Sequence, residues 1–322
     1  MKILVTGGAG FVGSHVSEYY AKKGDEVIVL DNLSRGETLK TADRRESSIN
    51  YNWNHLKNVE NIELAKGDIR KEDEIIKAVE GVDAVIHAAA QVAVTSSVND
   101  PRMDFEINAL GTFNVLEAAR KSENDPAVVY CSTNKVYGEN VNQVPVKEED
   151  TRYVFDGIDG VPETLSIDLC EHTPYGCSKL AGDLYVQDYA ELYGLKTAVF
   201  RMSCIYGTRQ FGNEDQGWVA HFVISTVMGK PLTIYGDGKQ VRDILYVSDL
   251  VRACDIFIES NKKSGVYNIG GGPKNTISLL ELLDLLEEET GKRSEITFST
   301  WRPSDQKVYV SDITKAKKEL GW

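Results

Sequence analysis

The sequence predicts an α/β protein in which helices cover both faces of a parallel sheet and a smaller lobe follows. Short β-branched apolar runs alternate with amphipathic stretches through the first two hundred residues, without an internal repeat. This alternation is typical of a doubly wound parallel sheet, whose strands are buried on both faces. The composition agrees, since 42% of the 322 residues are hydrophobic and 26% are charged, as in a folded globular chain.

The expected strands and helices follow one another in order. The apolar runs predict strands at Ile3–Val5, Val27–Leu30, Ile62–Leu64, Ala84–Ile86, Val128–Tyr130 and Thr197–Phe200. The amphipathic stretches predict helices at Phe11–Lys23, Asp73–Val79, Phe105–Ala119 and Lys179–Leu192. A long polar insertion, residues 41–57, follows the second strand and is expected to be a solvated loop, with a flap or an interface arm as alternatives.

The pattern loosens after Arg201 and predicts a second, smaller α/β lobe that binds substrate. Phe211–Trp218 is polar and aromatic and predicts a loop, with strands near Leu232–Tyr235 and Val266–Ile269 beyond it. Ser278 and Glu281 form a capping box at the start of a leucine-rich helix. We therefore expect a dinucleotide-binding domain at residues 1–202 with a return segment near 236–260, and a lobe at 203–235 and 261–322.

Charge and cysteine usage exclude several classes of protein. The net charge is −13 and no basic block appears, which argues against a nucleic-acid partner. The five cysteines are scattered and form no CxxC pair, so neither a disulfide framework nor a zinc site is expected. No apolar run reaches the roughly 18 residues of a membrane helix, and the N-terminus lacks a signal-peptide core. The sequence thus predicts a cytoplasmic protein without membrane or metal.

A glycine-rich turn follows the first strand and opens the first helix. Gly7, Gly10 and Gly13 are spaced G-x-x-G-x-x-G, with Phe11 and Val12 between the last two. Glycines here let the backbone approach a pyrophosphate, and the helix N-terminus supplies free N–H groups. Because the triplet lies between a strand and a helix, it predicts a Rossmann-type dinucleotide site rather than an ordinary turn.

Further cofactor contacts are expected at the ends of the next strands. Asp31 lies 24 residues after Gly7, where an acid binds the adenosine ribose and repels a 2′-phosphate. NAD is therefore favoured over NADP, although Arg35 keeps NADP open. Asp68 could contact the adenine or cap a helix. The remaining expected cofactor residues are neighbours of these acids or small residues after the fourth strand: Asn32, Ile69, Ala88 and Ala89.

Tyr175 and Lys179 form a Y-x-x-x-K pair, which places both side chains on one face of a helix. The ammonium, together with oxidised nicotinamide, is expected to lower the pKa of the phenol, so that tyrosine takes a proton while hydride leaves the carbon. Ser132 and Thr133 follow the fifth strand, where α/β sheets bind ligands. Thr133 is expected to help pass the proton, or else to cap the following turn.

Together these motifs resemble the extended short-chain dehydrogenase/reductases that act on sugar nucleotides. Two later segments resemble signatures of that family: Tyr235–Asp243 (YGDGKQVRD) and Arg302–Asp305 (RPSD), the latter with serine where glycine is usual. The resemblance covers essentially the whole chain. It implies an NAD cofactor, a nucleoside-diphosphate sugar as substrate, and diphosphate contacts from Arg242 and Arg302. It also implies a homodimer formed through the helices at Phe105–Ala119 and Lys179–Leu192.

The residues after Thr133 favour epimerisation over dehydration. Dehydratases of this family carry Asp and Glu there, whereas this chain has Asn134 and Lys135, and an amide cannot serve as a carboxylic acid. Epimerisation needs only Tyr175, Lys179, Thr133 and NAD: hydride leaves the sugar, the keto-sugar turns over, and the hydride returns to the other face. A net sugar dehydrogenase and a non-catalytic NAD-sensing protein are the alternatives from other classes.

The carbon and the nucleotide are suggested by further resemblance. Segments 103–108, 132–138, 207–211 and 215–219 resemble those of CDP-paratose 2-epimerases, which implies C2 epimerisation of a CDP-hexose. UDP-glucose 4-epimerases share the frame and remain the alternative, although they usually have asparagine at the position of Ser203. Gln210, Gln216 and Trp218 are expected to line the sugar or base pocket, or else only to pack the loop.

Overall fold

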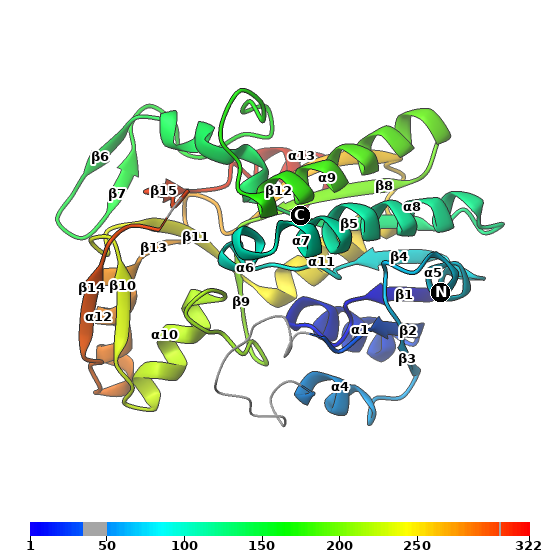
Figure 1. Cartoon of the computed structure of the whole chain (residues 1–322), viewed down its shortest axis with the longest axis horizontal. Coiled ribbons are helices and arrows are strands. Elements are labelled where there is room, and N and C mark those ends of the chain that lie inside the picture. Colours follow the sequence, from blue (N-terminus) through cyan, green and yellow to red (C-terminus); the bar gives the residue numbers. More distant parts are fainter. Residues whose placement is uncertain (35–49, 303) are drawn as a thin grey trace.

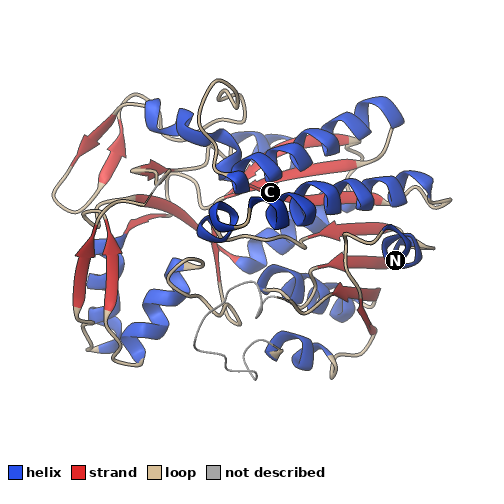
Figure 2. Ribbon diagram, viewed as in Figure 1, coloured by secondary structure: helices blue, strands red, loops and turns tan. Residues whose placement is uncertain are grey.

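A computed structural model describes residues 1–34, 50–302 and 304–322. A seven-stranded parallel sheet forms its centre, in the order β12-β8-β5-β4-β1-β2-β3 (Figures 1 and 2). The strands are β1 (Lys2–Thr6), β2 (Glu26–Asp31), β3 (Ile62–Lys66), β4 (Ala84–His87), β5 (Ala127–Thr133), β8 (Thr197–Met202) and β12 (Ser264–Ile269). The six predicted strands of the first two hundred residues are confirmed. Part of the predicted insertion, residues 41–49, and Arg35 lie outside the described residues.

Helices cover both faces of the sheet, as a doubly wound fold requires. On one face α1 (Phe11–Lys23) packs with α11 (Val247–Glu259) and α13 (Thr314–Leu320), and on the other α5 (Glu72–Val79), α8 (Gly111–Lys121) and α9 (Pro174–Tyr193) lie side by side. Each face buries its own apolar cluster, with Ile3 and Val5 on one side and Leu4 on the other. Alternate residues of one buried strand thus serve two cores.

The predicted limits of the lobe are wrong for two elements. Strand β12 pairs with β8 in the central sheet, and Ala316 and Leu320 of α13 are buried in the core beneath that sheet. The sequence predicts that β12 and α13 belong to the smaller lobe, within residues 261–322. Periodicity identified the strand correctly, but the neighbour with which a strand pairs is decided by tertiary packing.

The predicted helix at Phe105–Ala119 is interrupted. It comprises α7 (Pro101–Phe105), a π-helical turn η1 (Glu106–Leu110) and α8. The Asp100 side chain caps α7 by accepting a hydrogen bond from the backbone N–H of Met103. A π-turn adds one residue to a helical turn, and such turns occur frequently at functional sites.

Two further expectations need correction. Part of the predicted insertion loop forms a helix, α4 (Tyr51–Leu56), in which Leu56 is fully buried against the core. Helix α9 starts at Pro174, five residues before the predicted start, because Thr173 caps it by accepting from the Gly176 N–H. Tyr175 therefore lies in the first turn of this helix.

The smaller lobe lies beside the carboxyl ends of the strands (Figure 1). Its core joins α10 (Trp218–Val227) and α12 (Leu279–Thr290) to the pair β10 (Leu232–Tyr235) and β14 (Ile296–Ser299). The capping box of Ser278 and Glu281 is confirmed. The remaining elements connect lobe and sheet: α6 (Val94–Asn99), η2 (Asn134–Gln143), β6 (Val146–Glu148), β7 (Tyr153–Phe155), β9 (Cys204–Tyr206), β11 (Val241–Tyr246), β13 (Thr276–Ser278) and β15 (Val308–Tyr309).

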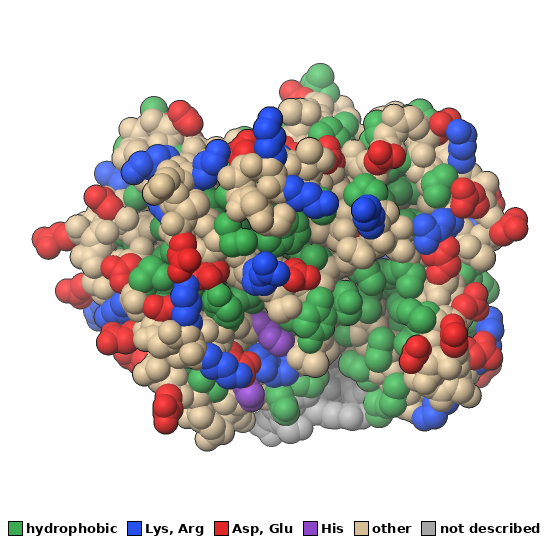
Figure 3. Space-filling view, turned by 180° about the vertical axis from the view of Figure 1, so that it is seen from behind, with side chains coloured by type: hydrophobic (Ala, Val, Ile, Leu, Met, Phe, Trp, Pro, Cys, Tyr) green, Lys and Arg blue, Asp and Glu red, His purple; other side chains and the backbone are tan. Residues whose placement is uncertain are grey.

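On the face seen in Figure 3, basic and acidic side chains of the described residues are interspersed. None of the helices described is both long enough and apolar enough to cross a bilayer.

Candidate active site

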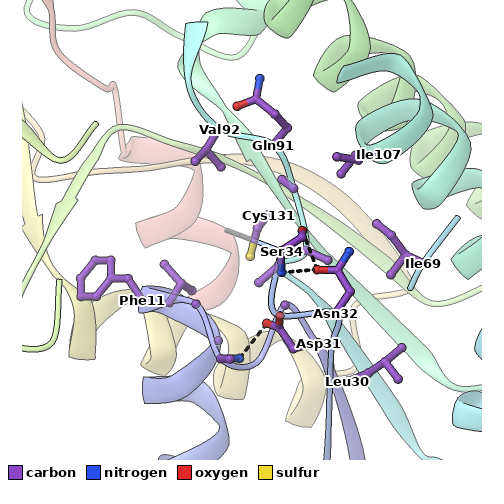
Figure 4. A pocket seen from close by; sticks show the side chains of 18 of the residues that line it. Phe11, Leu30, Asp31, Asn32, Ser34, Ile69, Gln91, Val92, Ile107 and Cys131 are labelled. Carbon is purple, nitrogen blue, oxygen red and sulfur yellow. Dashed lines mark hydrogen bonds between the residues drawn. The ribbon is translucent and has the colours of Figure 1, made fainter. Parts of the chain in front are cut away.

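Two adjoining cavities open at the carboxyl ends of the central strands. The first, of about 240 Å³, lies over the glycine turn and is lined by every residue predicted to bind the cofactor (Figure 4). The second, of about 530 Å³, lies between the sheet edge and the lobe. Val92, Tyr175 and Gln216 line both cavities, so Tyr175 is placed where a cofactor and a substrate would meet.

The glycine turn has the close packing that a dinucleotide site requires. Gly7 has φ +67°, and a Cβ there would lie 2.6 Å from the Ala89 backbone; a Cβ on Gly13 would lie 2.3 Å from the Gly7 oxygen. Helix α1 begins at Gly10 without a side-chain cap and without an acid in its first turn. Its free N–H groups and positive dipole end therefore face the first cavity and suit a diphosphate.

Asp31 shapes the turn as well as lining the cavity. Its carboxylate accepts hydrogen bonds from the N–H groups of Ala9 (3.0 Å) and Leu33 (2.8 Å). Asn32 donates to Asp68 at 3.1 Å. The ion pair with Arg70 lowers the pKa of Asp68 to about 2. The charge and shape of this end of the cavity fit the adenosine part of NAD.

Lys179 is held rigidly beneath the junction of the cavities. Its Nζ donates to the Cys131 carbonyl oxygen at 2.7 Å and lies 4.1 Å from the centroid of the Tyr130 ring. Burial lowers its pKa to about 8. Both contacts are ones an ammonium prefers, so they orient the side chain along α9 on the same face as Tyr175.

The pKa of Tyr175 depends on its burial. Burial raises it to about 12 in this cofactor-free structure, and contact with the Thr133 hydroxyl opposes that rise. The predicted lowering requires the ammonium and oxidised nicotinamide together, so it stays a prediction. A buried phenol is neutral because its anion loses hydration, and one ammonium held against a carbonyl and a ring does not compensate for that loss. The other contribution that the sequence predicts to the lowering of the pKa of Tyr175 is the positive charge of the nicotinamide.

The serine and threonine after β5 have different surroundings. Ser132 lines the first cavity, but its hydroxyl donates to Asp183, the buried partner of Arg201. Thr133 lines the second cavity, and its hydroxyl is 3.3 Å from the Asn134 side-chain oxygen. The Thr133 hydroxyl also accepts a hydrogen bond from the Lys135 N–H at 3.3 Å, so the expected alternative of capping the following turn is observed. Ser132 instead binds Asp183 beneath the sheet edge.

Most of the predicted substrate residues line the second cavity: Thr133, Asn134, Tyr175, Gln216, Trp218, Arg242 and Arg302. Two do not. The Ser203 hydroxyl bonds to Asp243, and the Gln210 amide donates to the Ile205 carbonyl at 3.1 Å. For Gln210 the alternative of loop packing, rather than a pocket contact, describes what is observed. Neither residue is brought to a cavity surface.

A buried polar network under α9 was only partly predicted. Asn108, in the π-turn η1, bonds to both backbone groups of Gln91 and to the side chains of Asp104 and Ser178. This network ties η1 to the helix that carries the tyrosine and lysine. Asp104 and Asn108 belong to segment 103–108, which the resemblance singled out. Only the fold brings them within reach of Gln91.

The state of His87 and the question of a metal site also bear on the chemistry. His87 is fully buried between the hydroxyls of Thr6 (2.7 Å) and Thr112 (3.0 Å), and burial lowers its pKa to about 3. It is therefore a neutral histidine of the core. Within the part of the chain that the structure describes, no cluster of histidine, cysteine or acidic side chains could hold a metal ion.

Fold and site define an NAD-dependent enzyme of the short-chain dehydrogenase type: a dinucleotide cavity meets a substrate cavity at a tyrosine–lysine pair. The chain belongs to the NAD dependent epimerase/dehydratase family, whose model matches residues 3–270. It is 41% identical to CDP-paratose 2-epimerase of Salmonella typhi, across all of this chain and 94% of that one. It is 35% identical to a putative UDP-glucose 4-epimerase of Methanocaldococcus jannaschii, over 99% and 92% of the two chains.

Solved structures of epimerases superpose on the whole of this chain. The UDP-glucose 4-epimerase of Thermotoga maritima, determined with UDP-glucose, superposes with a TM-score of 0.79 at 33% identity, covering 100% of this chain and 93% of that one. The UDP-glucuronic acid 4-epimerase of Bacillus cereus, in complex with UDP-glucuronic acid and NAD, gives 0.80 at 29%, with the same coverage. NAD is the cofactor of this family, and the residues around the first cavity fit it.

Proposed function

We propose that the protein is an NAD-dependent nucleotide-sugar epimerase that acts through a transient keto-sugar. The observation that carries this proposal is the position of Tyr175, which lines both cavities beside Thr133. Asn134 and Lys135 stand where a dehydratase needs an acid and a base. At these two positions the chain therefore lacks the acid/base pair with which a dehydratase expels water.

In this mechanism each side chain has a defined task. NAD, held by the residues of the first cavity, would supply the acceptor and donor of a hydride. Tyr175 takes the proton of the sugar hydroxyl and later gives it back, with Thr133 bridging the two oxygens. Lys179 orients the tyrosine and stabilises its anion. Arg242 and Arg302 hold the diphosphate, so the keto-sugar turns over while its nucleotide stays bound.

For the substrate we propose a CDP-hexose, epimerised at C2. The 41% identity to a CDP-paratose 2-epimerase along the whole chain supports this choice. UDP-glucose 4-epimerase activity is the second candidate, because relatives of that name are 35% identical in sequence and 33% identical among solved structures. Both reactions use the same catalytic groups, so only the orientation of the sugar distinguishes them.

The decisive experiment incubates the protein with a panel of CDP-, UDP- and GDP-hexoses and identifies products by NMR. We expect C2 inversion of a CDP-hexose without accumulation of NADH, because the hydride returns in each cycle. Conversion of UDP-glucose to UDP-galactose, with CDP-sugars inert, would contradict the C2 assignment. Stoichiometric NADH absorbance at 340 nm would instead indicate a net dehydrogenase.

Replacing Tyr175 with Phe tests the catalytic assignment. We expect at least a 10²-fold loss of turnover with NAD still bound, since the phenol oxygen transfers the proton and does not hold the cofactor. Turnover at the wild-type rate would eliminate the mechanism. A protein that binds NAD but converts no sugar in either form would be the non-catalytic sensor.

A further inference from the structure

Lys135 lines the second cavity, and the epimerase mechanism above does not use it. It lies two residues after Thr133, in the η2 turn that leaves β5, and is partly buried. Its Nζ donates to the Ser304 carbonyl oxygen at 3.2 Å, and it forms no ion pair with any of the described residues. A partly buried ammonium that has no carboxylate partner indicates a site for an anionic ligand, whose charge would compensate that of the lysine.

The other cations of this cavity are already neutralised. Arg242 is 3.1 Å from a carboxylate oxygen of Asp305, and Arg302 is 3.5 Å from one of Asp215 while it donates to the Glu214 carbonyl at 3.0 Å. His221 also lines this cavity, and burial lowers its pKa. The two arginines alone therefore leave the cavity without the net positive charge that a diphosphate needs.

Position decides which part of a nucleotide sugar Lys135 can reach. The proposed function assigns the reacting sugar carbon to Thr133 and Tyr175 and the diphosphate to Arg242, and all three residues line this cavity. Lys135 follows Thr133 by two residues and lies close enough to Arg242 and Asp305 for both charges to act on it. It is therefore placed beside the phosphate that bears the sugar.

We propose that Lys135 is a substrate-contacting residue whose ammonium supplies the uncompensated positive charge for the sugar-bearing phosphate, and so fixes the pivot about which the keto-sugar turns. This rests on the proposed function, since it assumes a nucleoside-diphosphate sugar as substrate. On binding, the ammonium replaces its hydrogen bond to the Ser304 carbonyl with one to a phosphate oxygen. No covalent bond is made or broken. Charge-assisted contacts of this kind are among the stronger hydrogen bonds in proteins.

Binding of sugar-free nucleotides tests this role without turnover. Titration calorimetry on the NAD-loaded protein would compare CDP and UDP, which carry the second phosphate, with CMP, which lacks it. We expect Lys135→Met to weaken CDP or UDP binding by about tenfold and CMP binding by no more than about twofold. Lys135→Arg keeps the charge and should restore most of the diphosphate affinity. Lys147→Met, at an exposed lysine of β6, is the matched control.

A pH series separates charge from shape. Burial lowers the pKa of Lys135 to about 8, and the charged or titratable groups that act on it are Arg242, Asp305, Cys204 and Glu139. Between pH 7 and 9 the wild-type protein should lose CDP affinity, whereas Lys135→Arg should not. Equal diphosphate affinity of wild type and Lys135→Met, or an equal loss for CMP, would overturn the proposal for Lys135 alone. A wild-type protein that binds no nucleoside diphosphate would contradict the proposed function itself.

Discussion

At the scale of single residues, Lys179 shows how a catalytic group is kept in place at a cost in stability. An ammonium buried at 3% exposure has lost nearly all its hydration, and a carbonyl and an aromatic ring replace only part of it. Its pKa is accordingly lowered from 10.5 to about 8. The folded, cofactor-free protein therefore holds a charge that the unfolded chain would hold more favourably.

This predicts that Lys179→Met stabilises the cofactor-free protein while it abolishes activity. Below pH 8 both states carry the ammonium, so the folded wild type bears the full cost and the variant gains up to about 3 kcal/mol. Between pH 8 and 10.5 the unfolded chain binds a proton that the folded chain has lost, so wild-type stability rises with pH and the difference shrinks. Urea unfolding at pH 7 and pH 10 measures this difference in stability between wild type and Lys179→Met.

The control for this prediction is Lys77→Met, at an exposed lysine of α5. Its stability relative to wild type should not change between the two pH values. A Lys179→Met variant that is less stable than wild type at pH 7 would show that the contacts with Cys131 and Tyr130 outweigh the loss of hydration.

Residue chemistry was the part of the site most open to prediction from sequence. Gly7, Asp31, Tyr175 and Lys179 act through local geometry, and all of them line the first cavity as expected. Ser203 was less predictable, because its hydroxyl is bound by Asp243, a residue forty positions away that only pairing of β9 with β11 brings near. Asp243 ends the signature segment Tyr235–Asp243, for which the resemblance implies a role of Arg242 but none of the acid.

At the scale of elements, the packing of α9 against β5 sets the position of both catalytic side chains. Gly182 is the point of closest approach: a Cβ there would lie 2.5 Å from the Tyr130 hydroxyl oxygen and 3.2 Å from a methyl of Thr112. The Tyr130 hydroxyl itself donates to the Lys179 carbonyl at 3.2 Å. A displaced helix would therefore move Tyr175 and Lys179 together.

We predict that Gly182→Ala costs about 1–3 kcal/mol of stability and lowers kcat more than it changes NAD binding, because an added methyl forces the helix outward. The second substitution Tyr130→Phe removes the obstructing hydroxyl and keeps the ring beneath Lys179, so the double variant should recover much of both losses. Thermal unfolding and steady-state kinetics on the four forms complete the cycle. Additive losses in the double variant would argue against this contact as the cause.

Element boundaries were predictable where caps are local in sequence. Helix α1 matches its prediction in full, and the capping box of Ser278 and Glu281 marks the start of α12. The π-turn at Glu106–Leu110 was not predictable, because the bonds of Asn108 that accompany it go to Gln91 and Ser178 in other elements. Likewise α4 looked like a polar loop, since its few apolar side chains are buried only against the sheet.

At the scale of the whole molecule, we propose a homodimer. The exposed faces of α8 and α9 carry large apolar side chains side by side, with Phe113 and Tyr185 in edge contact at 5.7 Å between ring centroids. Phe113 is 36% exposed, Leu184 47% and Tyr185 45%. These are the helices through which the resemblance implied pairing, and an apolar surface of this kind favours association.

We predict that Leu184→Glu yields a folded monomer, because a charge buried opposite its own copy is repelled and desolvated. Size-exclusion chromatography with light scattering should show a dimer for wild type and a monomer for the variant, with circular dichroism unchanged. Ile76→Glu, at a comparably exposed apolar residue of α5, is the matched control and should remain dimeric. A monomeric wild type would contradict the proposal.

By itself the sequence determined which chemistry is present and where along the chain it lies. The glycine turn, the acid after β2 and the tyrosine–lysine pair depend on spacings of a few residues, so local geometry suffices to identify them. Only the tertiary structure decided which charges remain available. Arg242 and Arg302 meet Asp305 and Asp215 while Lys135 meets no carboxylate among the described residues, and β12 joins the central sheet. These outcomes depend on contacts between distant segments, whose energies no local pattern encodes.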